Sequence, residues 1–207
     1  MSDVTPIRDP GTDSLLTPQN AVLALIDYQP EQYAGVRSVG HDELLAHVTM
    51  LGRVATVFGL PVVLSTVYVK HGMSGTNPEL REALPGVPEI DRTSMNSWED
   101  PDFRAAVQKT GRRKLVIAGL WTEVCVAFPT LDAIREGYEV YVVADAIGGV
   151  SKVAHDSAMQ RMVQAGAVPI TVLGLACELQ RDWGRPQADR LRGIMREYFG
   201  KMHALQR

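Results

Sequence analysis

The sequence predicts a single-domain α/β fold, a Rossmann-like parallel β-sheet with helices on both faces. Short apolar runs alternate along the chain with segments that carry apolar residues at helical spacing. Runs such as Ala21 to Ile26 are apolar at every position, which is typical of strands buried on both faces. Strands that alternate with helices indicate right-handed βαβ units. The 207 residues are an ordinary length for one domain, and no internal repeat divides them.

The expected elements follow one another without a linker. Strands are expected at 21–26, 61–67, 115–120, 140–144 and 168–173, with a short further strand near 87–91. Helices are expected at 42–58, from Asp100-Pro101 to Gly111, from the end of the 115–120 strand to Gly137, at 151–165 and at about 187–203. Cap residues, an early Pro and a closing Gly mark these helix ends.

Three parts of the chain are distinguished by composition. Residues 1–20 are rich in Asp, Thr, Pro and Ser and are interpreted as a surface arm. Residues 21–183 form the α/β domain, and its irregular segment 70–98 is expected to be a functional loop. Residues 184–207 hold a final helix with one apolar stripe, which must pack on its own chain or on a second copy. The stripe consists of Leu191, Ile194, Met195, Tyr198, Phe199 and Met202.

Charge and cysteine content exclude several classes of protein. Lys plus Arg number 21 and Asp plus Glu number 24, so the net charge of −3 argues against nucleic-acid binding. The apolar runs fall short of the ~18 residues of a membrane span, and the N-terminus does not have a signal-peptide pattern. Two cysteines without a C-x-x-C motif fit a cytoplasmic protein.

Polar residues that follow the strands are the candidates for chemistry, because ligands of open parallel sheets bind at the carboxyl ends of the strands. Asp27 comes directly after six apolar residues, so its pKa is expected to rise, and a general base is one interpretation. The other interpretation is a local turn in which Asp27 binds nearby backbone N–H groups.

Cys125 follows the strand at 115–120 in the segment Gly119-Leu-Trp-Thr-Glu-Val-Cys125. If Thr122 caps a helix there, the positive end of the helix dipole favours a thiolate at Cys125. A Thr cap would, however, take the N–H of Cys125 that an oxyanion needs. Cys125 could equally be a small buried hydrophobe, and Cys177 is expected to be inert packing.

A cation is needed to hold a thiolate charged, and Arg92 is better placed for this than Lys114. Lys114 begins its strand, roughly 20 Å from the Cys125 end. Arg92 could instead form a salt bridge with Asp91, Glu99 or Asp100, or be a solvated surface residue. Trp98 and Trp121 could wall a pocket or be core aromatics.

Metal and cofactor signals are weak. The five histidines do not pair at a ligand spacing, and neither a G-x-G-x-x-G motif nor a P-loop follows the first strand. We therefore expect neither a metal nor a cofactor.

Three motifs together resemble the isochorismatase-like cysteine hydrolases, a superfamily that includes nicotinamidases and N-carbamoylsarcosine amidohydrolases. They are Ala24-Leu-Ile-Asp-Tyr-Gln29, Arg92-Thr-Ser-Met-Asn-Ser-Trp98 and Gly119-Leu-Trp-Thr-Glu-Val-Cys-Val126. The resemblance covers about residues 20–183 and is strongest to a branch of uncharacterised bacterial hydrolases that form homo-oligomers. The Asp-x-His metal pattern of nicotinamidases is not visible in the sequence.

The resemblance implies a role for each matching residue. Asp27 matches the acid that takes the thiol proton, and Cys125 matches the nucleophile of an Asp–Lys–Cys catalytic triad. Backbone N–H groups of Trp121 and Cys125 match the oxyanion hole, and a cis peptide is implied between Leu120 and Trp121. Arg92, or its neighbour by one residue, stands where the family has Lys; Arg can hold charge but cannot give up its proton. The remaining pocket positions are Gln29, Asn96, Trp98 and Trp121.

A retained Cys125 points to acyl transfer at a small amide, carbamoyl or related C–N group through a thioester. Loop 70–98 is expected to carry the selectivity for this substrate. Two alternatives remain: a catalytically silent oligomeric scaffold, which Arg92 in place of Lys motivates, and a thiol redox sensor, in which Cys177 would have to resolve Cys125.

Overall fold

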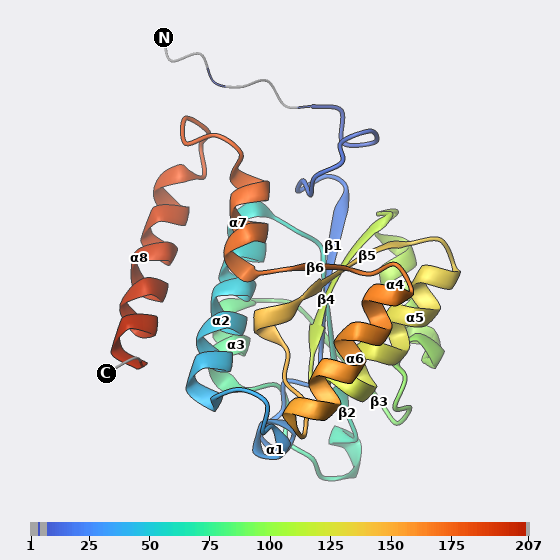
Figure 1. The fold of residues 1–207 in the computed structure, drawn as a ribbon. Coiled ribbons are helices and arrows are strands. Elements are labelled where there is room, and N and C mark those ends of the chain that lie inside the picture. The colour runs from blue at the N-terminus through green and yellow to red at the C-terminus, as the bar shows by residue number, and fades with distance from the viewer. Residues whose placement is uncertain (1–3, 5–7, 206–207) are drawn as a thin grey trace.

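The computed structural model describes residue 4 and residues 8–205, and its centre is one sheet of six parallel strands (Figure 1). The strand order is β3-β2-β1-β4-β5-β6. The strands are β1 (Ala21–Ile26), β2 (Val62–Val67), β3 (Glu89–Arg92), β4 (Lys114–Gly119), β5 (Glu139–Val143) and β6 (Val168–Ile170). The predicted fold class is therefore confirmed.

Helices cover both faces of the sheet, with α2, α3, α7 and α8 on one side and α4, α5 and α6 on the other (Figure 1). The helices are α1 (Pro30–Gly35), α2 (His41–Phe58), α3 (Pro78–Ala83), α4 (Pro101–Lys109), α5 (Ala127–Arg135), α6 (Lys152–Gln164), α7 (Val172–Gln180) and α8 (Ala188–Leu205). Short helical turns are η1 (Val69–His71), η2 (Ser97–Glu99), η3 (Thr122–Val126) and η4 (Ala144–Ala146). Among the residues that the structure describes, no helix is long and apolar enough to span a membrane.

The sheet order creates one place where loops diverge. All residues of β1 and β4 are buried, as their apolar sequences predict, and Ile26 at the end of β1 pairs with Gly119 at the end of β4. From β1 the chain builds outward through β2 and β3, then crosses to β4 and builds in the other direction. Loops after β1 and β4 therefore separate at the carboxyl edge, which is where ligands bind in such sheets.

Helix ends follow the expected local chemistry in α2 and α4. The Asp100 carboxylate accepts hydrogen bonds from the N–H groups of Asp102 and Phe103, and Gly59 closes α2 with a φ of 64°. Segment 70–98 is more ordered than its composition predicted, because Asn77 caps α3 and Pro78 begins it. The short third strand, expected near 87–91, lies at Glu89–Arg92.

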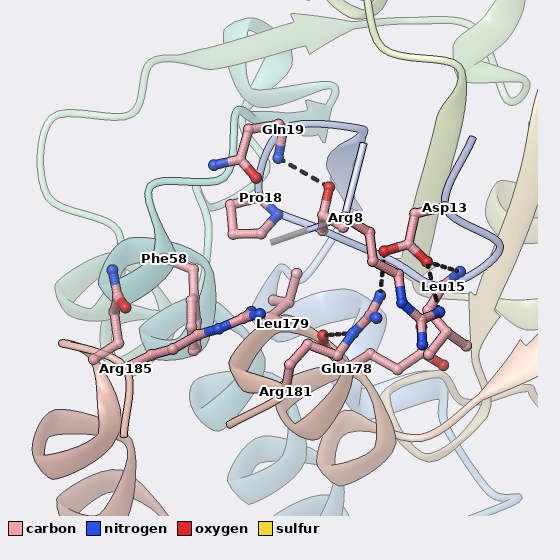
Figure 2. Close-up of a pocket in the computed structure, with 12 residues that line it drawn as sticks. Arg8, Asp13, Leu15, Pro18, Gln19, Phe58, Glu178, Leu179, Arg181 and Arg185 are labelled. Carbon is pink, nitrogen blue, oxygen red and sulfur yellow. Dashed lines mark hydrogen bonds and ion pairs between the residues drawn. The ribbon is translucent and has the colours of Figure 1, made fainter. Parts of the chain in front are cut away.

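The described part of the N-terminal segment, which was expected to be a surface arm, is largely exposed but is anchored by buried side chains at Asp13, Leu16, Thr17 and Asn20. Leu16 is fully buried, and its N–H donates to the Glu178 carboxylate of α7 (2.7 Å). Arg181 forms an ion pair with Asp13 (3.1 Å) in a pocket of about 250 Å³ (Figure 2). Residues 1–3 and 5–7 lie outside the described residues. The segment packs because its few apolar and charged groups find partners at the end of α7.

Helix α8 lies on the outer side of α2 (Figure 1). Leu191 and Ile194 of its apolar stripe are buried, and the Tyr198 hydroxyl lies 3.0 Å from His47 Nδ1 of α2. Phe199 remains about half exposed. Most of the stripe thus packs on its own chain.

Candidate active site

Asp27 stands at the carboxyl edge, directly after β1. Its backbone has a φ of 59°, in the left-handed region that Asp tolerates better than most residues. Its N–H donates to the Ser65 carbonyl oxygen of β2 (2.9 Å), which fixes this turn. The side chain is fully buried, so the turn aims a carboxylate into the protein and away from solvent.

Arg92 ends β3 and reaches across the edge of the sheet to Asp27. Its Nη2 lies 2.5 Å from Asp27 Oδ2, and both side chains are completely buried. Its Nη1 donates to the Ser94 carbonyl oxygen. Asp27 Oδ1 and Arg92 Nε are buried without a hydrogen-bond partner among the described residues. The pair therefore holds one carboxylate oxygen and leaves the other open.

Asp91, the alternative match to the third family position, makes its hydrogen bonds to the segment after β2 and not to Asp27. Its carboxylate accepts hydrogen bonds from the N–H groups of Val69 and Lys70, both at 2.9 Å. These bonds hold its pKa low, although partial desolvation opposes them. Arg92 is thus the residue that meets Asp27, and its salt bridge is to Asp27 rather than to Asp91, Glu99 or Asp100.

Cys125 lies in η3, a single π-helical turn between β4 and α5. The Trp121 carbonyl accepts hydrogen bonds from the N–H groups of Val124 (3.1 Å) and Val126 (3.3 Å), the residues on either side of Cys125. Such turns recur at functional sites. The peptide bond between Leu120 and Trp121 is cis, at the position that the resemblance implied. Cys125 is 7% exposed.

Thr122 does not cap this turn, so the arrangement that the sequence left open does not occur. Trp121 is the N-cap residue, and the Thr122 hydroxyl instead lies 2.9 Å from His155 Nδ1 of α6. The conflict over the N–H of Cys125 is therefore resolved, because the side chain that would have taken it binds elsewhere.

Burial has the largest effect on the pKa values of Asp27 and Cys125. It raises the pKa of Asp27 to about 6, against the opposing charge of Arg92. Burial and the charge of Asp27 raise the pKa of the Cys125 thiol to about 12, while Arg92 and a hydrogen bond from the Trp121 backbone act to lower it. Burial and the Asp27 charge thus outweigh any lowering of the thiol pKa by the start of the helix, and they favour the neutral form of Cys125.

Trp121 and Gln29, two of the expected pocket residues, make hydrogen bonds to backbone groups. Trp121 lies four residues before Cys125, and its indole Nε1 donates to the Gln32 carbonyl oxygen (2.8 Å). Gln29 is fully buried, and its amide bridges to the backbone of Val67 and Ser74. These contacts use Gln29 to join β1 to β2 and to the following loop.

Asn96 and Trp98 also make structural contacts. The Asn96 amide donates to Asp132 (2.8 Å) and accepts from the N–H of Trp98 (3.1 Å). Trp98 packs edge-on against Phe103, and its Nε1 donates to Glu136 (3.0 Å). The core interpretation therefore describes Trp98 better than a pocket wall.

Lys114 and Cys177 lie away from the three reactive groups. Lys114 Nζ donates to the Ser14 carbonyl oxygen (2.9 Å) at the amino edge of the sheet, as its place in the strand predicted. Cys177 is exposed rather than packed, near the end of α7, where Glu178 contacts Leu16 ahead of β1. It therefore lies toward the amino edge of the sheet, whereas Cys125 follows the carboxyl end of β4. Within the described ranges, no three His, Cys, Asp or Glu side chains converge as metal ligands.

Sequence reasoning missed Gly35 and His155. A Cβ at Gly35 would lie 2.4 Å from Cζ2 of Trp121, so only glycine lets α1 approach this indole. His155 contacts Thr122 across 33 residues of sequence. Neither leaves a local sequence pattern, because each depends on a contact with a residue more than 30 positions away in the chain.

This α/β chain, with its buried acid and thiol at the carboxyl edge, belongs to the isochorismatase family: the model of the Isochorismatase domain matches residues 21–173. "Probable hydrolase YcaC" of Escherichia coli (strain K12) is 42% identical over 169 residues, which are 81% of each chain. The chain is accordingly a hydrolase of this family.

Two solved structures of YcaC proteins resemble this fold. YcaC from Pseudomonas aeruginosa, solved with hexane-2,5-diol and covalent acrylamide, is 36% identical with a TM-score of 0.84, covering 95% of this chain and 99% of that one. The Escherichia coli YcaC gene product, described as an octameric hydrolase of unknown specificity, is 38% identical with a TM-score of 0.84, covering 94% and 97%.

Proposed function

We propose that this chain hydrolyses a small amide, carbamoyl or related C–N substrate through a thioester on Cys125. One arrangement carries this function: Arg92 holds Asp27 Oδ2, Asp27 Oδ1 has no other partner among the described residues, and Asp27 interacts with the Cys125 thiol. The carboxylate is thus oriented as a general base for that thiol. The 7% exposure of Cys125 favours a small substrate over a polypeptide.

Acylation begins when the Cys125 thiol gives its proton to Asp27 and its sulfur attacks the substrate carbonyl carbon. The carbonyl electron pair moves to oxygen, where the backbone N–H groups of Trp121 and Cys125 stabilise it. When the C–N bond breaks, Asp27 returns the proton to the leaving nitrogen. Ammonia or an amine departs, and a thioester remains on Cys125.

Deacylation uses the same groups. Asp27 takes a proton from water, the resulting hydroxide attacks the thioester carbonyl, and the C–S bond breaks as the sulfur regains a proton. Arg92 keeps its charge throughout and supports the ionised carboxylate and the developing oxyanion. In this scheme a fixed cation suffices at the third position, and Arg92 replaces the family Lys.

Release of ammonia or amine from a panel of small amides and carbamoyl compounds tests this function. The wild-type chain and Cys125→Ser, with Cys177→Ser as the matched control, are compared on each compound. We expect at least one compound to be hydrolysed by the wild type and by Cys177→Ser, and the Cys125→Ser rate to fall by at least ~10²-fold. A Cys125→Ser rate equal to that of the wild type would contradict the mechanism.

A catalytically silent scaffold is the second candidate, and the raised pKa of the Cys125 thiol is the observation that favours it. In a scaffold the buried thiol would stay protonated even when an acyl donor is present. The two functions differ in one result: the hydrolase forms an acyl adduct on Cys125, and the scaffold does not.

A homo-oligomer is part of the proposal, because the YcaC relative from Escherichia coli is described as octameric. Apolar side chains that remain on the surface, Met95 and Val153 among them, offer contact area for a second copy. Light scattering coupled to size exclusion tests this, with a mass several times that of one chain expected and a monomer contradicting it.

A further inference from the structure

Tyr68 follows β2 in a backbone conformation that aromatic residues rarely adopt. Its φ of 66° and ψ of 21° lie in the left-handed region, where Gly, Asn and Asp are the usual occupants. Asp27, the proposed general base at the same edge of the sheet, also has a positive φ. Strained residues cluster at active sites and ligand-binding segments, so the Tyr68 side chain is a candidate for a function.

The turn at Tyr68 is held by groups other than its side chain. The Tyr68 N–H donates to the Arg92 carbonyl oxygen (2.8 Å), and the Tyr68 carbonyl oxygen accepts the N–H of His71 (3.0 Å). The Asp91 carboxylate accepts the N–H groups of the first two residues of η1, both at 2.9 Å. Asn could make the same backbone contacts with less strain. The fold therefore does not account for an aromatic side chain at this position.

The ring of Tyr68 lies at the surface against the imidazole of His71. Their centroids are 4.4 Å apart and their planes meet at 35°, and Tyr68 is 46% exposed. A ring that remains so exposed gains little from burial to offset the strained backbone. What the pair offers is a flat apolar face, which suits an aromatic group of a ligand.

Strand β2 ends beside the segment that carries Asp27. Val67, the last residue of β2, exchanges hydrogen bonds with the side-chain amide of Gln29, two residues after Asp27 (2.8 and 2.9 Å). In the strand order, only β1 separates β2 from β4, so the ends of β2 and β4 are roughly 10 Å apart. A small substrate whose carbonyl group reaches Cys125 can therefore extend its other end toward Tyr68.

We propose that Tyr68 is a specificity-determining residue: its ring, backed by His71, receives an aromatic group of the substrate, so amides that carry such a group react in preference to unsubstituted ones. This inference rests on the proposed function, since it narrows the substrate class of the same site. Tyr68 supplies neither a proton nor a charge to the reaction. Its contribution is contact with the part of the substrate that does not react.

Iodoacetamide and iodoacetanilide test this role, because they share the reacting carbon and differ by one phenyl ring. Alkylation of Cys125 and Cys177 is followed in the same chain by peptide mass spectrometry, and the exposed Cys177 reports the intrinsic reactivity of each reagent. Relative to Cys177, Cys125 should prefer iodoacetanilide by ~3–10-fold in the wild type and in Tyr68→Phe, which keeps the ring. Tyr68→Asn should lose this preference, while its rate with iodoacetamide should change by less than about twofold.

Two controls separate recognition from a structural role. Phe199→Ala removes a similarly exposed aromatic ring (48%) from α8 and should leave the preference unchanged. The urea midpoint of Tyr68→Asn should equal or exceed that of the wild type, because Asn adopts the left-handed conformation with less strain.

The inference would be overturned by a wild type without the preference or by a Tyr68→Asn chain that keeps it. A lower urea midpoint in Tyr68→Asn, or a smaller mass by light scattering, would overturn it as well, because the ring would then serve the fold or a contact between copies. Alkylation does not require hydrolysis. A chain that prefers iodoacetanilide but never forms an acyl group on Cys125 would therefore contradict the proposed function and not the aromatic subsite.

Discussion

Arg92 Nη2 contacts only one oxygen of the buried Asp27 carboxylate, Oδ2, at 2.5 Å. The other oxygen, Oδ1, has no hydrogen-bond partner with standard geometry among the described residues. A bidentate Arg–carboxylate pair would satisfy both oxygens and behave as a structural ion pair. The one-sided contact keeps the carboxylate charged and oriented while it remains able to accept a proton. In the proposed mechanism, this division of the two oxygens leaves one of them able to accept the proton of the buried thiol.

Hydrolysis should depend on pH through Asp27. Burial raises the pKa of this carboxyl to about 6. Because a general base must be ionised, the rate should rise with pH up to about 6 and level off above it. Asp27→Asn should lose this rise and at least ~10²-fold of the rate. The measurement is a pH–rate profile of both proteins on one hydrolysed compound. If Asp27→Asn keeps the same rise in rate near pH 6, that rise belongs to another group.

Stability should change with pH in the opposite sense to activity. The folded-state pKa of Asp27 lies above the ordinary value of 3.8, so the folded chain holds an extra proton between about pH 4 and 6. The stabilising contribution of this proton to the free energy of unfolding is fully present below about pH 4 and is lost as the pH rises through about 6. Chemical unfolding of wild type and Asp27→Asn should show a difference that varies across this window and is constant above it. A constant difference from pH 4 to 7 would refute the assigned shift.

Two substitutions should move the pKa of the Cys125 thiol in opposite directions. Asp27→Asn removes a neighbouring negative charge and should lower it, while Arg92→Gln removes a positive charge and should raise it. The pH dependence of iodoacetamide alkylation, resolved by peptide mass spectrometry, measures both shifts. Cys177 is exposed in the same chain and serves as the internal control. Shifts of the same sign would show that Cys125 does not sense these two groups.

The buried ion pair should matter to folding far more than an exposed one. Arg92→Met leaves the Asp27 carboxylate buried without its partner and should cost ~3–5 kcal/mol in the free energy of unfolding at pH 8. Arg53→Met, which breaks the exposed pair with Glu197, should cost at most ~1 kcal/mol. Urea unfolding compares the two, and equal costs would mean that the Arg92–Asp27 pair adds no more than a surface contact.

Gly35 should be required for the position of the Trp121 indole. A Cβ there would lie 2.4 Å from Cζ2 of Trp121, so Gly35→Ala should destabilise the fold by ~1–3 kcal/mol and slow acylation of Cys125. Gly193→Ala is the matched control, since a Cβ at this position of α8 meets nothing within 4 Å and should stabilise the helix by ~0.5–1 kcal/mol. A Gly35→Ala protein as stable and reactive as the wild type would mean that the indole can move freely.

The sequence was most informative where local chemistry decides the structure. Buried runs such as Ala21–Ile26 predicted the strands, and the rule for carboxyl ends brought Asp27 and Cys125 to one edge. The position of Asn96 and Trp98 could not be predicted in this way. Their side chains bind α5 and α4 rather than a pocket, and such contacts depend on how helices far apart in sequence pack together.

The direction of the Cys125 pKa shift also could not be predicted from neighbouring residues in the sequence. A thiol near a helix start suggests a lowered pKa, yet its depth of burial and the Asp27 charge reverse the direction. Likewise, the spacing of Thr122 and Cys125 predicts a cap, and only the fold brings His155 to the hydroxyl. Both outcomes depend on groups more than 30 residues away in the chain.

Trapping the acyl group on Cys125 tests the central claim most directly. The chain is mixed with p-nitrophenyl acetate, quenched in acid at increasing times and digested, and the peptides of Cys125 and Cys177 are compared by mass spectrometry. We predict an acetyl group that appears on Cys125, decays as water completes the reaction, and forms at least ~10²-fold more slowly in Asp27→Asn. An unmodified Cys125, or one acetylated no faster than the exposed Cys177, would contradict the account and favour the silent scaffold.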